Sequence, residues 1–236
     1  MLGKDISFES PEENILFDEL LLQLAEEGKL PETLRFWESS ITFIVLGRIS
    51  KAAEDLNLEA IRKDRIKVLR RGSGGGTVLQ GKGVLNFALV LSKDRPQVHD
   101  LKKSYQYILG KCVEALGELQ IKASFHPVCD IALVDGSKKI SGNAQKRGRQ
   151  YILHHGTFLI DFDLRLMSRY LKMPKSVPEY RNERSHEDFV TNLGIDRVNF
   201  KKVMMKVFGA ETRTSKWSPE EQARLREMVE KGIREV

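Results

Sequence analysis

The stretch that decides the fold is RRGSGGGTVLQGKGVLN, residues 70–86, which has an apolar run on either side. Two arginines stand ahead of a segment that is mostly glycine. Glycine permits positive φ and lets backbone N–H groups come close to an anion, and arginine adds cationic donors that suit phosphate or carboxylate. The stretch therefore predicts an anion-binding turn between two strands, and such a turn needs a second half elsewhere in the chain.

The same glycines could instead form a tight hairpin turn that binds no ligand, because glycine is first of all a turn residue. Two familiar phosphate-binding motifs do not fit the stretch. No Gly-Lys-Ser/Thr follows the glycines, as a P-loop requires, and Thr77 stands where GxGxxG has its third glycine. The binding turn and the empty turn both remain open on this stretch alone.

Composition points to an ordinary globular protein. The chain has 236 residues, of which 41% are hydrophobic and 31% charged, which suits one large domain with at most a small appendage. No apolar run approaches the roughly 18 residues that cross a bilayer, and the first residues do not resemble a secretory signal. The only cysteines are Cys112 and Cys129, which favours a reducing compartment. We therefore expect a cytoplasmic protein with no membrane partner, and no ligand spacing predicts a protein-bound metal.

The net charge of +6 and the pI of about 9.2 favour an acidic partner. The basic residues are spread along the chain, as in a mildly basic enzyme. A non-catalytic basic module that binds RNA is a second reading of this charge. Aromatic residues make up only 8%, and no run of them alternates with Lys or Arg as a stacking platform would need. We expect no nucleic-acid partner.

Periodicity, caps and turn residues divide the chain into helices and strands. Helices are predicted over 11–28, 56–63, 100–119, 164–170, 200–208 and 218–233, and strands over 33–38, 41–46, 66–71, 84–91, 151–153 and 157–162. A hairpin joins 131–134 to 139–141 around Asp135-Gly136, and 174–187 is interpreted as a loop. This order predicts an α+β fold with mixed, mostly antiparallel sheets flanked by helices.

The second half of the site lies in KKISGNAQKRGRQYILHHGT, residues 138–157. Taken alone, Lys139 would be a surface lysine. The two adjacent histidines suggest zinc, but neighbouring strand residues point to opposite faces, so we expect one to face inward and one outward without a metal. The segment KRGR, residues 146–149, is interpreted as a solvated loop at the mouth of the site.

Three motifs, RRGSGGGTV, KISGNA and HHGT, occur in order, and together the chain resembles the lipoate–protein ligase family, the biotin/lipoate protein ligase catalytic domain. The segments LRFW (34–37) and VLGR (45–48) look like that family's N-terminal strands, and the resemblance covers about residues 10–195. It implies that lipoate and ATP, with Mg²⁺, form lipoyl-adenylate and pyrophosphate. A lysine of an acceptor protein then takes the lipoyl group. Biotin ligases have a similar fold, but the motif combination looks like the lipoate branch.

The resemblance also assigns roles to residues. Lys139 would be the catalytic group, in contact with the lipoate carboxyl oxygen and the α-phosphate. The residues implied to bind nucleotide or lipoate are Arg70, Arg71, Gly75, Gly76, Thr77, Val78, Leu79, Asn86, Asp130, Ser141, Gly142, His155, Gly156 and Thr157. The implied partners are lipoyl domains or glycine cleavage H-like proteins as acceptors, and a separate accessory ligase subunit for the first step.

The chain departs from the family pattern in three places. Val84 stands where many ligases have Asn or Asp, Cys129-Asp130 stands in place of Asn-Asp, and only about 40 residues follow residue 195. We expect a catalytic domain over 1–195 and a short helical extension over 196–236, packed on it, without a full accessory domain. The short extension keeps a second reading open, in which the protein is an octanoyl or lipoyl transferase with a thioester on Cys129.

Overall fold

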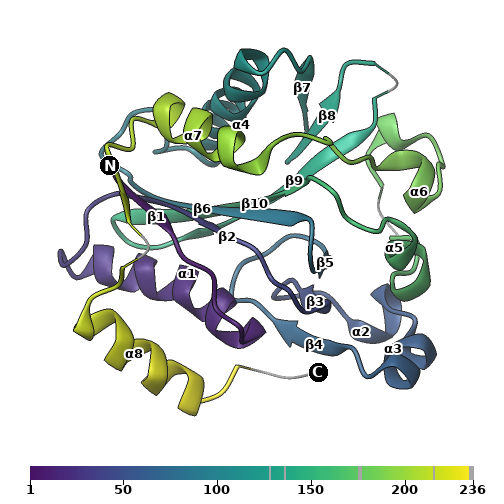
Figure 1. Cartoon of the computed structure of the whole chain (residues 1–236), viewed down its shortest axis with the longest axis horizontal. Helices are drawn as coiled ribbons and strands as arrows, with labels where there is room; N and C mark the ends of the chain where they lie inside the picture. Colours follow the sequence, from purple (N-terminus) through teal and green to yellow (C-terminus); the bar gives the residue numbers. More distant parts are fainter. Residues whose placement is uncertain (128, 136, 175–176, 215, 234–236) are drawn as a thin grey trace.

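A large mixed sheet forms the centre of the computed structural model, which describes residues 1–127, 129–135, 137–174, 177–214 and 216–233 (Figure 1). Its strand order is β11–β1–β2–β6–β10–β9–β8–β7. The first three strands are parallel to one another and every other neighbouring pair is antiparallel. The strands are β1 (Leu2–Asp5), β2 (Thr33–Trp37), β6 (Val84–Ser92), β7 (Ala123–His126), β8 (Asp130–Leu133), β9 (Lys139–Arg147), β10 (Tyr151–Leu159) and β11 (Thr212–Thr214).

Helices cover both faces of this sheet, so the predicted α+β class is confirmed. In Figure 1, α4 and α7 lie above the sheet, and α1 and α8 lie below it. The helices are α1 (Pro11–Glu26), α2 (Ala52–Asp55), α3 (Leu58–Asp64), α4 (Leu101–Glu118), α5 (Arg165–Tyr170), α6 (His186–Phe189), α7 (Arg197–Phe208) and α8 (Pro219–Glu230), with a 3₁₀ turn η1 (Glu179–Arg181).

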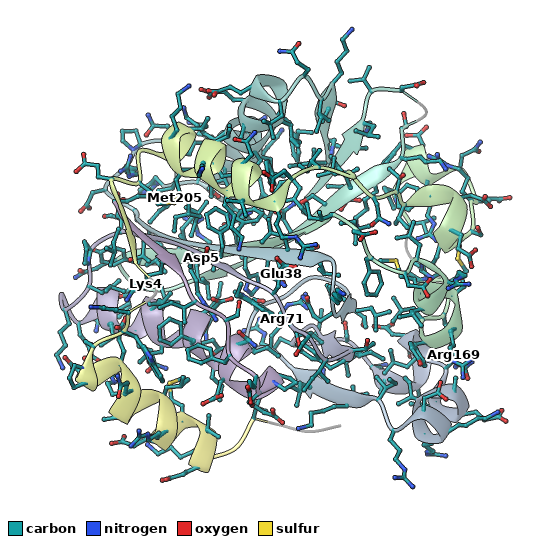
Figure 2. All side chains as sticks on the ribbon, viewed as in Figure 1. Lys4, Asp5, Glu38, Arg71, Arg169 and Met205 are labelled. Atoms are coloured by element: carbon teal, nitrogen blue, oxygen red, sulfur yellow. The ribbon has the colours of Figure 1, made fainter. Side chains whose placement is uncertain are left out.

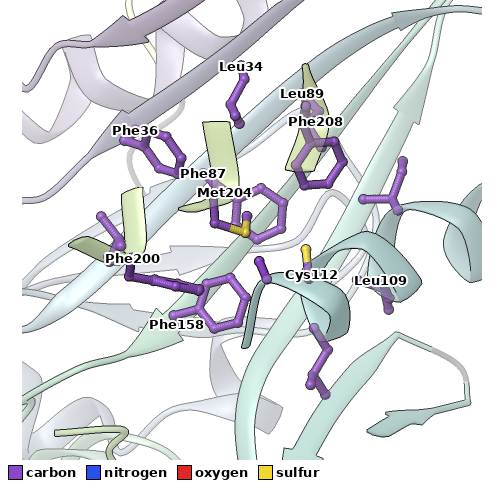
Figure 3. Packing of buried hydrophobic residues seen from close by; sticks show 14 of the residues in the cluster. Leu34, Phe36, Phe87, Leu89, Leu109, Cys112, Phe158, Phe200, Met204 and Phe208 are labelled. Carbon is purple, nitrogen blue, oxygen red and sulfur yellow. The ribbon is translucent and has the colours of Figure 1, made fainter. Parts of the chain in front are cut away.

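Strand β6 is apolar almost throughout because both of its faces are buried. Its side chains alternate between two hydrophobic clusters. Phe87 and Leu89 pack with α4 and α7, where Figure 3 shows Phe87 among Phe158, Phe200 and other side chains of that cluster. Ala88 and Val90 pack with α1 on the other side. The strand thus joins the two halves of the hydrophobic core.

The helices below the sheet begin where their caps predict. The Ser10 hydroxyl accepts a bond from the Glu13 N–H at the start of α1. Ser218 and Glu221 form a capping box at the start of α8. Helix α8 then packs on α1 through Leu225, with the adjacent Trp217 against Phe17.

A second sheet of three strands, in the order β4–β3–β5, packs beside the first. Its strands are β3 (Phe43–Leu46), β4 (Lys67–Arg70) and β5 (Val78–Gln80). The predicted glycine turn connects β4 to β5, which lie on opposite sides of β3. The turn is therefore not a tight hairpin. It crosses the carboxyl end of β3, where a strand end leaves room for a ligand.

Some predicted elements differ from the observed ones. The two strands expected over 151–153 and 157–162 are one strand, β10, because His154–Gly156 continue the ladder to β6 and β9. Strand β9 extends to Arg147, so the expected loop over 146–149 begins two residues later. The expected 131–134/139–141 hairpin is present as the antiparallel pair β8–β9, although Gly136 of its turn lies outside the described residues.

Several short elements are absent from the prediction. They are β1, β5, β7, β11, η1, α2 and α6. Each is only three or four residues long, so its sequence carries little periodicity. Segment 174–187 contains η1 and the start of α6, where a loop was expected.

The C-terminal segments join both layers of the fold. Helix α7 packs on α4, and β11 extends the sheet beside β1. The division of the chain at residue 195 stays a prediction. In the part of the chain that the structure describes, no helix has the length and apolarity to cross a membrane.

A buried ion pair fastens α1 to β2 and gives a test of the fold. The Arg35 guanidinium, fully buried, donates to the Asp18 carboxylate at 2.6 Å and to the carbonyls of Asn14 and Ile6. We expect Arg35→Leu to lower the free energy of unfolding by about 3–5 kcal/mol, because it leaves the Asp18 charge buried without its cation. Urea denaturation measures this difference.

The exposed pair Arg165–Asp163 serves as the control, because 83% of the Arg165 side chain is in solvent. Arg165→Leu should leave the urea midpoint nearly unchanged. Equal midpoints for the two variants would contradict the role given to Arg35.

Candidate active site

A cavity of about 140 Å³ lies where the two sheets and α1 meet. Strand pairing aligns its floor, because Trp37, Asn86, Thr157, Gly142 and Asp130 stand opposite one another across five neighbouring strands. The glycine turn forms the facing wall. The cavity therefore draws its lining from segments far apart in the sequence.

Most of the predicted site residues line this cavity. They are Arg71, Gly76, Thr77, Val78, Asn86, Asp130, Lys139, Gly142, His155, Gly156 and Thr157. The structure thus brings the glycine turn, the Lys139 strand and the histidine strand to one place.

Four predicted residues do not line the cavity. The Arg70 guanidinium donates to the carbonyls of Gly47 and Ser50, and so supports the turn from outside. Leu79 is buried in the core of the small sheet, and the buried hydroxyl of Ser141 accepts a bond from the side chain of Asn143. Gly75 lies close by, at φ +84°, where any other residue would be strained.

Arg71 holds the glycine turn from within (Figure 2). Its guanidinium donates to the Ser73 hydroxyl at 2.9 Å and to the carbonyls of Gly74 and Gly76 at 2.7 and 2.8 Å. In the described part of the chain its hydrogen bonds go to hydroxyl and carbonyl groups, so no carboxylate neutralises its charge. Burial lowers the pKa of Arg71 to about 10, which leaves a buried cation on the cavity wall at neutral pH.

The turn also packs against the end of β3. A Cβ on Gly47 would lie 2.0 Å from the Gly75 carbonyl oxygen, so only glycine fits there. The Arg48 N–H donates to the Ser73 carbonyl at 2.9 Å. Within the described residues, no hydrogen bond occupies the backbone N–H groups of Gly75, Gly76 and Thr77. These groups remain available to an anion.

Lys139 reaches the cavity from the first residue of β9. Its amine lies 2.8 Å from Asp130 Oδ1, and 28% of its side chain is exposed. The other oxygen, Oδ2, accepts a hydrogen bond from the Tyr180 hydroxyl at 2.8 Å. Gly142 leaves room for the lysine, because a Cβ there would lie 3.1 Å from the amine.

The two histidines point to opposite faces of β10, but the expectation that one faces outward is wrong. Both faces of the sheet are covered by helices or by the small sheet. His155 Nε2 lies 2.7 Å from the Ser73 hydroxyl, inside the cavity. His154 is fully buried on the other face and contacts Gln145 and Asn143.

Burial keeps both histidines neutral. It lowers the pKa of His154 to about 3. It also lowers the pKa of His155 well below the usual value, helped by the neighbouring Arg71, His154 and Lys146. Each ring is therefore a fixed hydrogen-bonding group at neutral pH.

Asn143 is a cavity residue that the sequence motif did not single out. Its amide donates to the Cys129 carbonyl at 2.9 Å, next to Asp130. Gly156 makes space for it, because a Cβ there would lie 2.0 Å from the Asn143 side-chain oxygen. In the motif KISGNA this asparagine occupies the variable position, so no sequence signal marks it as a site residue.

Helix α1 supplies a second missed group, Glu19. Its carboxylate accepts bonds from the Gly72 N–H and from the Lys146 amine, both at 2.9 Å. Lys146 thus lies on a strand in an ion pair, and not in a solvated loop. The pairing of α1 residues with the turn depends on tertiary contact, which a local pattern does not reveal.

The carboxylates of the cavity wall are all engaged by protein groups. Asp18 binds Arg35, Glu19 binds Lys146, and Asp130 binds Lys139. In the described residues no group of three His, Cys, Asp or Glu side chains could hold a metal ion.

The chain matches the family model of the lipoyl protein ligase A/B catalytic domain over residues 10–209. It therefore belongs to this family, as the three motifs indicate. Relatives similar to it include both lipoate-protein ligases and octanoyltransferases. A probable lipoate-protein ligase A of Mycoplasma pneumoniae is 31% identical over 163 residues, 69% of this chain and 46% of that protein. An octanoyltransferase LipM of Brevibacillus brevis is 30% identical over 187 residues, 70% of this chain and 67% of that protein.

Solved structures agree on the fold. A bipartite lipoate protein ligase from Thermoplasma acidophilum superimposes with a TM-score of 0.82 at 24% identity, covering 98% of this chain and 93% of the other. A lipoate-protein ligase A bound with ATP superimposes with a TM-score of 0.81 at 23% identity, covering 98% of this chain and 95% of the other. The chain spans about half the length of the curated ligases it matches.

The buried His154 predicts how stability depends on pH. Because its pKa is lowered in the folded state, the unfolded state binds the proton more tightly between about pH 6.5 and 3. The free energy of unfolding should therefore fall as the pH drops through this window, by about 1.4 kcal/mol per pH unit for this one group. His155 acts in the same direction.

Urea denaturation at pH 7 and pH 5 measures this dependence. His154→Gln should reduce the slope by about 1.4 kcal/mol per pH unit, which is the share of one proton. A slope that His154→Gln leaves unaltered would show that His154 is not the titrating group.

Proposed function

We propose that this protein is an ATP-dependent lipoate–protein ligase. It activates lipoate to lipoyl-AMP with release of pyrophosphate, and it transfers the lipoyl group to a lysine of an acceptor lipoyl domain. One observation carries the proposal. Lys139, Arg71 and two residues of the glycine turn with unpartnered N–H groups, Gly76 and Thr77, all line one cavity.

The first step brings two anions together, and these groups meet that need. A lipoate carboxylate oxygen forms a bond to the α-phosphorus, and the bond from that phosphorus to pyrophosphate breaks. Negative charge shifts toward the bridging and leaving oxygens, where fixed cations and N–H donors stabilise it. Lys139 would contact the carboxylate and the α-phosphate, and the N–H groups of Gly75–Thr77 would hold the phosphates. Mg²⁺ bound to the phosphates would neutralise the leaving pyrophosphate.

The second step needs only that the adenylate stays in place. The neutral amine of the acceptor lysine forms a bond to the carbonyl carbon of the mixed anhydride. The bond from that carbon to the phosphate oxygen breaks, AMP leaves, and the amine proton passes to solvent. Lys139 and Arg71 would again stabilise the charge on the departing phosphate.

The cavity also offers an apolar wall for the lipoyl tail. Ile15, Trp37 and Val45 line it. Burial of a hydrocarbon chain against such a wall contributes about 0.8 kcal/mol for each methylene. The carboxyl end then lies toward Lys139 and the tail toward α1.

Transfer through a cysteine thioester is the competing function, since octanoyltransferases are among the relatives. Cys129 lines the cavity, but burial and the neighbouring Asp130 raise the pKa of its thiol. A catalytic cysteine needs a lowered pKa, because the thiolate is the nucleophile. The described contact of the thiol is the Asp130 carboxylate at 3.8 Å, which disfavours the thiolate. The ligase therefore fits the site better.

The acceptor and any accessory subunit are part of the proposal. The Thermoplasma acidophilum neighbour is a bipartite ligase described with its lipoyl domain, which supports a lipoyl domain or an H-like protein as the acceptor. We propose that residues 1–195 form the catalytic domain and 196–236 an extension of it. We propose a separate accessory subunit for the first step, and the assay below includes candidates for it.

We expect the protein to release pyrophosphate from ATP, Mg²⁺ and lipoate, and Lys139→Ala to lower that rate at least a hundredfold, as loss of a group that stabilises transition-state charge does. A coupled pyrophosphate assay measures the rate, and mass spectrometry detects lipoylation of a lipoyl domain. The neighbouring exposed Lys138 gives the matched control, since Lys138→Ala should keep wild-type activity.

Candidate accessory subunits are added to the same assay. No pyrophosphate with or without them would overturn the ligase. Undiminished activity of Lys139→Ala would overturn the role of Lys139.

Cys129→Ser separates the ligase from the transferase. A ligase should keep its rate within about twofold, because the thiol takes no part in either step. The pyrophosphate assay measures the ligase rate, and a parallel reaction with octanoyl carrier protein as donor follows acyl transfer by mass spectrometry. The transferase would be established instead if the wild type carried an acyl-thioester on Cys129 and if Cys129→Ser lost both the thioester and the activity.

A further inference from the structure

We propose that Tyr180 is a positioning residue for Lys139, acting through Asp130. The proposal deepens the proposed function and rests on the role given there to Lys139. Tyr180 belongs to the 3₁₀ turn η1, in a segment that the sequence motifs do not cover. It does not line the cavity, so it would act only through its partner.

The carboxylate of Asp130 is held at both oxygens by different groups. Oδ1 lies 2.8 Å from the Lys139 amine, and Oδ2 accepts the Tyr180 hydroxyl at 2.8 Å. A carboxylate held at both ends cannot rotate to offer both oxygens to the lysine. Asp130 is also 94% buried, so solvent does not compete strongly for Oδ2.

This arrangement leaves most of the lysine ammonium available. An ammonium group has three N–H donors and no acceptor. Its described partner is Asp130 Oδ1, in an ion pair, and no hydrogen bond of the Lys139 amine occurs within the described residues. Its N–H donors can meet one oxygen of the lipoate carboxylate and one of the α-phosphate. Tyr180 thereby directs Lys139 toward the substrates.

Contacts other than the hydroxyl bond also hold Tyr180 in place. Its ring stacks on His126 of β7 at 4.2 Å between centroids and lies 5.1 Å from Phe189. The Arg184 side chain donates to the Tyr180 carbonyl at 2.7 Å and to the Ser137 carbonyl at 3.2 Å. Removal of the hydroxyl alone should therefore leave the ring in place.

The same segment also holds the main chain of Lys139. The Thr191 N–H donates to the Lys139 carbonyl at 3.0 Å, and Val190 forms a parallel bridge with Lys139. The segment from Tyr180 to Thr191 thus contacts the lysine at its backbone and, through Asp130, at its amine. Burial and the Asp130 charge raise the pKa of the Tyr180 hydroxyl, so it remains a neutral donor at physiological pH.

The decisive variant is Tyr180→Phe. We expect kcat for pyrophosphate release to fall roughly tenfold or more, the size expected when a hydrogen bond to a charged group is lost, with KM for lipoate and ATP within about twofold. The chain offers a matched control. The Tyr170 hydroxyl donates to Asp64 at 2.9 Å, and Asp64 also pairs with Arg169, away from the cavity lining.

Tyr170→Phe removes the same kind of bond and should leave kcat at the wild-type value. Wild-type kcat in Tyr180→Phe, or an equal loss in both variants, would overturn the proposal.

A double-mutant cycle tests whether Tyr180 acts through Asp130. In the Asp130→Ala background, Tyr180→Phe should change kcat by less than about twofold, because the acceptor of the Tyr180 hydroxyl is gone. The same loss in both backgrounds would show that Tyr180 acts by another route.

Amine labelling separates this proposal from the proposed function. The wild type and Tyr180→Phe are treated with an amine-reactive reagent, and labelling of Lys139 relative to the exposed Lys138 is read by mass spectrometry. Lys139 should react faster in the variant, because a freely rotating Asp130 holds the amine less firmly. An unchanged or slower rate would overturn the positioning role. A wild type that releases no pyrophosphate would instead overturn the ligase.

Discussion

The site depends on the uninterrupted pairing of β10 with β6 and β9. This pairing sets Thr157 opposite Asn86 on one side and Gly142 on the other, and β8 continues the row to Asp130. A slip of one residue in β10 would turn His155 and Thr157 away from the cavity. Glycine at position 156 is required by the same register, because the Asn143 side chain occupies the space of a Cβ there. The register of one central strand therefore determines which side chains the cavity contains.

The charges of the cavity are arranged in two different ways. Arg71 is a buried cation whose bonds go to the turn that it supports, so its charge is not neutralised by a carboxylate. Lys139 is paired with Asp130, but through one oxygen of that carboxylate only. The histidines add no charge, since burial lowers the pKa of His154 to about 3 and that of His155 in the same direction. The result is a cavity with a positive wall, which attracts anions and depends little on pH near neutrality.

Much of this arrangement could be predicted from the sequence, for physical reasons. The apolar run of β6 and the capped α1 are local patterns, and both elements are present. The glycine turn and Lys139 are recognisable in the sequence. Close approach to the backbone of the turn requires glycine, and a cation directed into the cavity requires a basic residue, so both positions strongly restrict the residue type. The predicted break in β10 over residues 154–156 is wrong, and Gly156 gives the physical reason. In the fold it stays in the ladder and gives space to Asn143.

The groups that hold the site were harder to predict. Glu19 reaches the turn from a helix more than fifty residues away, and Tyr180 reaches Asp130 across a separation of fifty. Such contacts leave no periodic or compositional signal, because each is a single side chain whose partner is set by the tertiary fold. A sequence motif identifies the residues that touch the substrate more readily than the residues that orient them.

The distinction between ligase and transferase depends on whether the cavity contains a free base. A thioester mechanism requires a group that removes the proton of the cysteine thiol. Among the described residues that line the cavity, Asp18, Glu19 and Asp130 are each paired with a cation. His155 is bound to Ser73. With its bases engaged and its donors directed inward, the cavity suits stabilisation of phosphate charge better than activation of a thiol. In the proposed ligase, the ion pairs of the cavity wall therefore keep these carboxylates from serving as a base beside Cys129.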